Sequence, residues 1–169
     1  YLSFAADRVA AAGGLAHLPA EAAAAVVFLA YGIGGKLGLA TGHLEARFGL
    51  EALLRGIFTA GAASLVLIAL APGSWPGVVA SAAMHGAALM MISAVLSFWS
   101  LRLFPGQAAL GFTAALLGLG VGSVLGPASA GLLATAFGPE VMFAVAALPA
   151  AATALLLRPR RERCDVAAD

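Results

Sequence analysis

Two residues of this chain with the capacity for chemistry lie inside long apolar runs. Lys36 interrupts the run GIGGKLGLA, and His85 interrupts the run SAAMHGAAL. A charged or titratable side chain inside a membrane is energetically costly, so each is a candidate functional residue. The Lys36 ammonium could bind an anionic substrate or carry a coupling charge, and the His85 imidazole could carry a proton near neutral pH. The plainer alternatives are a Lys36 that reaches the membrane surface or contacts its own bundle, and a hydrogen-bonded structural His85.

Other side chains could complete a binding site around these two. Tyr31 is one candidate, with ordinary core packing as its alternative. An adaptable apolar wall for lipophilic substrates could come from the methionines and aromatic residues of one apolar run: Met84, Met90, Met91, Phe98 and Trp99. Ordinary core packing is the plainer explanation of these residues.

Catalytic and metal-binding constellations are not visible in the sequence. His17 and His43 are expected near opposite membrane faces, too far from His85 to share a site with it. The single cysteine, Cys164, lies in the charged C-terminal tail, so the chain can form neither an internal disulfide nor a cysteine metal site. A net charge of +1 with scattered basic residues excludes a nucleic-acid footprint. The sequence thus favours a protein that is not an enzyme and holds no metal or cofactor.

The elements that must position these residues are predicted to be membrane-spanning helices. The chain is 62% hydrophobic and 10% charged, against about 25% charged residues in soluble domains. A bilayer core about 30 Å thick is crossed by roughly 20 apolar helical residues. Five runs approach or exceed this length, at about 22 to 42, 54 to 71, 77 to 101, 108 to 136 and 141 to 157. Their continuous apolar character predicts an all-α polytopic membrane protein, because barrel strands would alternate.

The distribution of arginine predicts the orientation in the membrane. Lys and Arg collect in short cytoplasmic loops. Arg47 and Arg55 fall in one connection and Arg102 in another on the same side, whereas Arg8 stands alone on the opposite side. The tail adds four arginines to the first side: Arg158, Arg160, Arg161 and Arg163. We therefore expect residues 158–169 to be a cytoplasmic tail following a helical domain over 1–157, in which residues 1–9 end a sixth helix.

Glycines at helical spacing form two stripes. Gly34, Gly38 and Gly42 recur every fourth residue in the first span. The fourth span carries the same device in Gly118, Gly122, Gly126 and Ala130. Because glycine costs a helix up to about 1 kcal/mol relative to alanine, two such stripes predict close approach of another backbone. Lys36, roughly 200° around an ideal helix from Gly34, is expected to point away from the stripe. Simple helix dimerisation is the alternative use of the stripes.

Two motifs resemble those of the major facilitator superfamily of transporters. Within TGHLEARFG, Gly42, Leu44, Arg47 and Gly49 match the family's Gly-x-Leu-x-Asp-Arg-x-Gly loop, although Ala46 replaces the aspartate and Glu45 lies beside it. The fourth span is similar to the family's Gly-x-x-x-Gly-Pro-x-x-Gly-Gly pattern, with Ala130 in place of one glycine. Its matching residues are Gly122, Gly126, Pro127 and Gly131.

The resemblance implies a fragment from the C-terminal half of a twelve-helix fold, covering about helices eight to twelve. No arginine interrupts the third span, as one would in the family's N-terminal half, and a short tail follows the last span. The implied function is secondary transport of a small molecule by alternating access, through efflux or proton coupling. Helices eight and eleven, which carry the glycine stripes, would meet the N-terminal six-helix half of the same chain, and helix ten, with His85, would line the cavity.

The implied location is a bacterial inner membrane. The eight arginines against one lysine and the abundant Ala and Gly agree with a GC-rich bacterial genome. The expected partners are the lipid bilayer, the small-molecule substrate and protons. The alternative function is that of a non-transporting membrane assembly or scaffold protein whose glycine stripes only pack helices.

Overall fold

The computed structural model describes residues 1–14, 20–104 and 106–157. These residues form seven α-helices and one 3-10 helix, η1, and no strand occurs among them. In chain order the elements are α1 (Leu2–Ala11), α2 (Ala20–Gly35), η1 (Lys36–Ala40), α3 (Thr41–Phe48), α4 (Leu50–Leu70), α5 (Trp75–Leu103), α6 (Ala108–Phe137) and α7 (Pro139–Leu156).

Five helical segments are long and apolar enough to cross a membrane. They are Ala22–Phe48, Leu50–Leu70, Trp75–Leu103, Ala109–Phe137 and Pro139–Leu156. The first of them combines α2, η1 and α3 into one continuous span. The predicted all-α polytopic fold with five spans is therefore confirmed, and residues 2–11 form the further helix expected before them. The predicted tail, residues 158–169, lies outside the described residues, as does His17.

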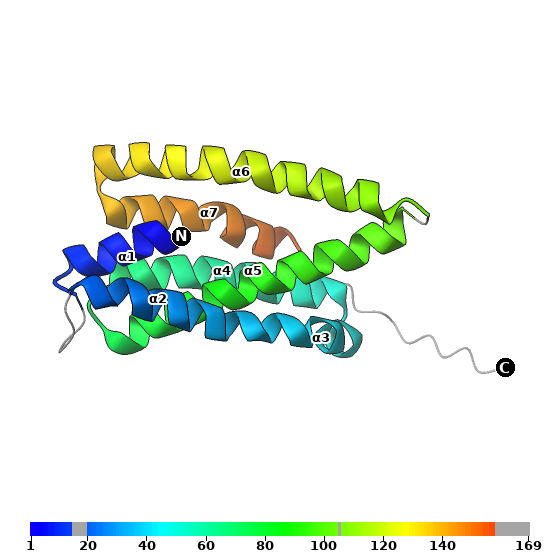
Figure 1. Ribbon diagram of the computed structural model, residues 1–169, viewed down its shortest axis with the longest axis horizontal. Helices are drawn as coiled ribbons and strands as arrows, with labels where there is room; N and C mark the ends of the chain where they lie inside the picture. Colours follow the sequence, from blue (N-terminus) through cyan, green and yellow to red (C-terminus); the bar gives the residue numbers. More distant parts are fainter. Residues whose placement is uncertain (15–19, 105, 158–169) are drawn as a thin grey trace.

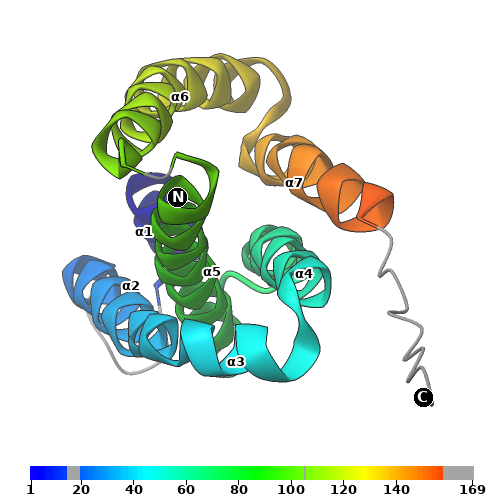
Figure 2. The ribbon, with the colours of Figure 1, turned by 90° about the vertical axis from the view of Figure 1, so that its right-hand side faces the viewer.

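The helices run roughly along one axis, and α5 occupies the middle of the bundle (Figures 1 and 2). Seen along that axis, α2 and α4 lie on either side of α5, and α6 runs along the edge of the bundle (Figure 2). Successive spans alternate in direction. We call the end that carries α3 the α3 end, and the end that carries the α4–α5 and α6–α7 turns the Arg8 end (Figure 1).

Glycines and a polar cap set the helix boundaries. Gly49 and Gly138, with φ of 77° and 88°, occupy a backbone region that side chains other than glycine rarely adopt, so each separates two consecutive helices by one residue. Ser74 caps α5, because its Oγ accepts a hydrogen bond of 3.1 Å from the backbone N–H of Gly77. Pro76 follows in the first turn, where the backbone N–H would lack a helical partner in any case.

The predicted loop over residues 43 to 55 is wrong in its local structure. These residues are helical except for Gly49, with Arg47 on α3 and Arg55 on α4. The segment between Gly42 and Gly49 contains neither glycine nor proline, so nothing in it breaks the helix that enters from η1. The chain reverses at the single positive-φ residue instead.

Two apolar clusters hold the bundle together. The cluster at the Arg8 end joins residues of α1, α2, α4, α5 and α7, and its largest fully buried members are Phe143, Ile68, Val9, Val27 and Val78. The cluster at the α3 end is smaller and joins Leu53, Leu54 and Ile57 of α4 to Ala88 and Val95 of α5. Packing is therefore denser towards the Arg8 end, where α1 adds a further layer.

The first glycine stripe packs inside the bundle. A Cβ added at Gly34 would overlap the backbone carbonyl of Ala83, and one added at Gly86 would overlap the carbonyl of Tyr31. Helices α2 and α5 thus cross with their backbones in contact, through one glycine from each. A Cβ at Gly38 would stand 2.7 Å from Cβ of Met90. Gly34 and Gly38 therefore do not form the expected face towards another domain, because α5 already covers them.

Gly42 leaves this contact because the first span changes its winding. Residues Lys36–Ala40 form a 3-10 helix, closed by a hydrogen bond of 2.6 Å from Thr41 Oγ1 to the Gly38 carbonyl. A 3-10 helix turns faster per residue than an α-helix, so Gly42 does not stay in line with Gly34 and Gly38. Gly42 is exposed, and the nearest atom to a Cβ built on it is Cζ of Phe98 at 3.9 Å.

The second stripe, on α6, is open. A Cβ added at Gly118, Gly122 or Gly126 would meet no atom within 4 Å. Helix α6 contacts α5 and α7, and Ala130 packs on the core at the Arg8 end, but none of its residues from 109 to 137 is buried. It continues through Pro127 as a single helix. The stripe is therefore available to a partner outside the described part of the chain.

Candidate functional site

A cluster of polar and aromatic side chains lies inside the apolar bundle, where α1, α2, α4 and α5 meet. It consists of Tyr1, Tyr31, Ser64, Ser81 and His85. Ser64 and Ser81 are fully buried, and the other three are half-buried. Polar groups in such a position are costly unless they are hydrogen-bonded to one another or to the backbone.

A chain of hydrogen bonds connects Tyr1, Ser81, Ser64 and His85. The Ser81 hydroxyl donates to the Ser64 carbonyl at 2.7 Å, so its only proton is used there. The Tyr1 hydroxyl, 2.6 Å from Ser81 Oγ, must therefore be the donor in that pair. In the same way the Ser64 hydroxyl donates to the Gly61 carbonyl at 2.7 Å. Both serines thus use their proton on a carbonyl and accept a second hydrogen bond from an aromatic residue.

The hydrogen bonds of Ser64 determine which nitrogen of His85 carries a proton. His85 Nδ1 lies 2.9 Å from Ser64 Oγ, whose own proton points to Gly61, so Nδ1 must carry the proton that joins them. In the neutral ring Nε2 then has the free lone pair. Within the described residues, no group forms a hydrogen bond with Nε2. Nε2 therefore has a lone pair that can accept a proton or a hydrogen bond from a ligand.

Aromatic rings fix the plane of the imidazole. The Tyr1 ring stacks on His85 with centroids 4.0 Å apart and planes 9° from parallel. The Tyr31 ring lies 6.3 Å from His85 and 6.4 Å from Tyr1. Offset or parallel aromatic pairs at such separations are favourable beyond the area they bury. His85 is thus held both by its Nδ1 hydrogen bond and by the ring above it, as in a pre-organised site.

The structure brings together only two of the five predicted substrate or coupling residues. His85 and Tyr31 share the polar cluster. Met84, the neighbour of His85, instead lines a separate apolar cavity between α4 and α5. Lys36 is exposed at the start of η1, and Trp99 is 38% exposed on α5 towards the α3 end. Lys36 and Trp99 therefore belong to the surface of the bundle, where a partner or lipid would meet them.

The residues of the predicted loop motif take separate places at the α3 end. Leu44 lines the apolar cavity, and the Arg47 guanidinium lies 5.4 Å from the Phe48 ring centroid. Gly49 provides the positive-φ turn. Glu45, next to the position where the family motif has aspartate, forms an ion pair of 2.9 Å with Arg102 of α5. The acidic residue thus ties α3 to α5 and does not pair with Arg47.

A second ion pair closes the Arg8 end. Arg8 Nη2 lies 2.6 Å from Glu140 Oε1 of α7 and donates a further hydrogen bond of 3.2 Å to the Ala69 carbonyl at the end of α4. The Arg8 side chain is 14% exposed, whereas that of Glu140 is 71% exposed. Three helices that are distant in sequence are therefore joined by one guanidinium. Among the described residues, no three His, Cys, Asp or Glu side chains lie close enough to hold a metal ion.

Sequence reasoning missed the serines that complete the cluster. Ser81 and His85 are four residues apart, so they share one face of α5, and this spacing was readable. Ser64 is a single small polar residue in the second span, and nothing local pairs it with α5. Tyr1 and the Glu45–Arg102 pair depend on contacts between helices that the sequence does not order.

Comparisons of the chain with protein-family models, with curated proteins and with solved structures found no match. The membership of the major facilitator superfamily suggested by the two motifs stays a prediction. The structure establishes an apolar, helical protein of membrane character.

Proposed function

We propose that this chain forms part of a secondary transporter that moves a small molecule across a membrane by alternating access. The polar cluster around His85 carries the proposal. Hydrogen bonds among polar side chains also pack helices in lipid, but packing alone does not require a ring nitrogen that is left without a partner. Here α5 and its neighbours instead hold an imidazole with one nitrogen bonded and the other available. Such a group can bind a polar substrate or take up a proton during transport.

The open stripe on α6 supports a second half. In alternating access, two helical units rock against each other around a central site. Gly118, Gly122 and Gly126 leave one side of α6 bare over two turns, which permits close contact with a helix of another unit. We propose the N-terminal six-helix half of the same protein as that unit. The stripe of α2, which α5 covers, has no part in this contact.

The proposed location is a bacterial inner membrane with the α3 end and the tail on the cytoplasmic side. Arg47, Arg55 and Arg102 all lie near the α3 end of their helices, and Arg8 lies at the other. This is the asymmetry that the positive-inside rule associates with the cytoplasm. Efflux or proton coupling is the proposed mode, with His85 as the coupling candidate.

The test is transport by the full-length protein in proteoliposomes. Uptake of a panel of labelled small molecules is measured with and without a pH gradient, for the wild type and for His85→Gln. We expect the wild type to move at least one compound in a manner that depends on the gradient, and His85→Gln to lose that dependence. His43→Gln is the control, because His43 is exposed on α3. A His85→Gln protein with unchanged flux and unchanged gradient dependence would refute the role of His85.

The open face of α6 also favours a second candidate, a non-transporting membrane assembly protein. Such a protein would use Gly118, Gly122 and Gly126 to bind a partner helix and would not need Nε2 of His85. The two functions are separated by flux. In an assembly protein, Gly122→Leu would release the partner helix. No compound would cross the membrane with either the wild type or Gly122→Leu.

A further inference from the structure

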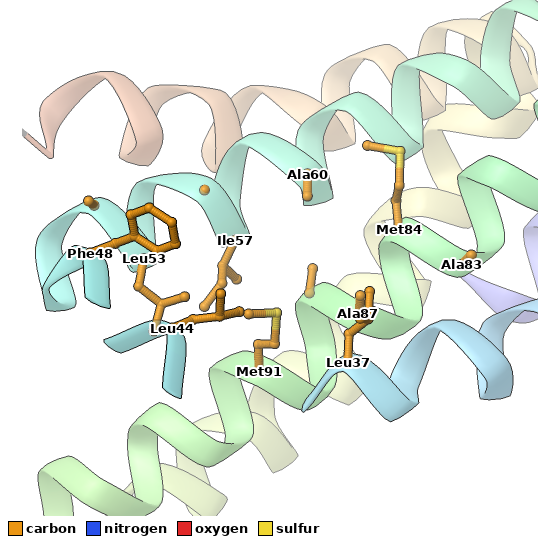
Figure 3. A pocket seen from close by; sticks show the side chains of 13 residues that line it. Leu37, Leu44, Phe48, Leu53, Ile57, Ala60, Ala83, Met84, Ala87 and Met91 are labelled. Carbon is orange, nitrogen blue, oxygen red and sulfur yellow. The ribbon is translucent and has the colours of Figure 1, made fainter. Parts of the chain in front are cut away.

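An apolar cavity of about 510 Å³ opens between the first span, α4 and α5 (Figure 3). Its wall contains only alanine, glycine, leucine, isoleucine, methionine and phenylalanine. The lining residues that Figure 3 labels include Phe48, Leu44 and Leu53 at one end and Ala60 and Met84 at the other. The volume is in the range of roughly 300–1,000 Å³ that small-molecule sites occupy.

A second hollow of about 570 Å³ continues this cavity along α4. The two share Ala52, Gly56, Ala60 and Met84. The second hollow adds polar residues that the first lacks, chiefly Arg55. An apolar chamber and a guanidinium therefore adjoin in one continuous groove.

The shape of the groove follows from the small residues of α4. Ala52, Gly56 and Ala60 fall four residues apart, and a Cβ built on Gly56 would meet no atom within 4 Å. The residues from Ala52 to Ala60 cover about 12 Å of helix at 1.5 Å per residue. Met84 and Met91 of α5 form part of the opposite wall, and unbranched methionines adapt to ligands of different outline. The groove therefore follows about two turns of α4 and has a deformable side.

Arg55 gives the groove its charge. It is exposed and takes part neither in the Arg8–Glu140 ion pair nor in the Arg102–Glu45 ion pair. Thr59, the other polar residue of the groove, donates its hydroxyl proton to the Arg55 carbonyl at 2.7 Å, so the guanidinium is the principal donor for a ligand. Its planar fork matches a carboxylate or a phosphate. Arg55 lies about 7.5 Å of helical rise from Leu50, and the apolar wall extends further from the α3 end.

We infer that this groove binds an amphiphilic anion with a single apolar chain, whose carboxylate or phosphate pairs with Arg55 and whose chain runs towards Met84. The anionic group pairs with the guanidinium, and the chain packs on the apolar wall in place of a lipid tail. A long-chain carboxylate has both parts. Binding at this site does not depend on the proposed transport function.

The test is photolabelling of the full chain in lipid nanodiscs. The probe is hexadecanoate with a diazirine near its terminal carbon, and the labelled residues are mapped by mass spectrometry. We expect labels on Ala83 or Met84, at the end of the groove towards which the chain runs. At a subsaturating probe concentration, Arg55→Gln should lower labelling about tenfold, the loss expected for one charge-assisted pair. Lys36→Gln is the control, because Lys36 is an exposed cation that takes part in neither of these ion pairs and lines neither hollow.

A second variant tests the chamber without touching the charge. Gly56→Leu fills the cavity and should also abolish most labelling, whereas Gly32→Leu places the same side chain where a Cβ meets no atom within 4 Å. Equal labelling of the wild type and both groove variants would overturn the site. Equal competition by hexadecyltrimethylammonium and free hexadecanoate would overturn the preference for an anion. Loss of labelling in phosphatidylglycerol discs but not in phosphatidylcholine discs would overturn the single chain and identify a two-chain lipid as the occupant.

Discussion

The contact between the backbones of α2 and α5 makes a sharp prediction for Gly34→Ala. The added methyl group would overlap the Ala83 carbonyl, so the two helices must separate. Overpacking of this kind destabilises a protein by about 1–3 kcal/mol. Alanine in place of glycine also stabilises a helix interior by about 1 kcal/mol. The net effect on the free energy of unfolding should therefore range from about zero to a loss of about 2 kcal/mol.

Gly32→Ala separates these two terms, because it lies on the same helix. A Cβ at Gly32 meets no atom within 4 Å, so this variant should gain the helix term alone, about 1 kcal/mol. The helix terms of the two variants cancel in their difference. Gly34→Ala should thus be less stable than Gly32→Ala by about 1–3 kcal/mol, the overpacking term.

The assay is reversible unfolding of the purified chain in mixed micelles, followed by circular dichroism at 222 nm as denaturing detergent increases. Both variants are compared with the wild type under identical conditions. Gly86→Ala should behave like Gly34→Ala, since Gly86 faces the Tyr31 carbonyl from the other side of the crossing. If Gly34→Ala proved as stable as Gly32→Ala, the close approach of α2 and α5 would be refuted.

Three further results are expected. Ser64→Ala should lower the free energy of unfolding by about 1–3 kcal/mol, because His85 Nδ1 then lacks its hydrogen-bond partner. Ser93→Ala, on an exposed face of α5, is the control. Equal stability of the two variants would contradict the hydrogen bonds of the cluster. A double-mutant cycle on Glu45→Gln and Arg102→Gln should give a coupling of about 1 kcal/mol or less, because the Arg102 side chain is 65% exposed, and a coupling of several kcal/mol would show a buried pair instead. In intact cells a membrane-impermeant maleimide should leave Cys164 unlabelled and should label it in inside-out vesicles; the reverse pattern would place the tail outside.

The fold was predictable because each span carries its own signal. Apolar length alone located the five spans, since the bilayer imposes the same requirement on every helix. The sequence could not locate the turn between the first two spans within a few residues, because the helix from η1 continues to Phe48 until Gly49 permits a positive φ. Apolar length thus predicts where a span lies, but not the residue at which its helix ends.

The site was only partly predictable because contacts between helices depend on rotation about each axis. His85 was identified by its cost in lipid, which is local. The helix that Gly34 contacts could not be identified from the sequence. A stripe of glycines at every fourth position has the same sequence pattern whether it packs on a helix of its own bundle or on a separate unit. The stripes on α2 and α6 differ only in what covers them. The apolar cavity is likewise a property of three elements together and leaves no mark on any one of them.

The short 3-10 segment of the first span has a mechanical consequence. Its five residues rise about 2.0 Å each and turn about 120°, whereas α-helical residues rise 1.5 Å and turn about 100°. Rewinding Lys36–Ala40 as α-helix would shorten the span by about 2.5 Å and swivel α3 by roughly 100° while α2 stayed clamped on α5. Leu44 and Phe48 would leave the wall of the cavity with it. The winding of η1 therefore sets the rotation of α3 relative to α2, and with it the position of one wall of the groove.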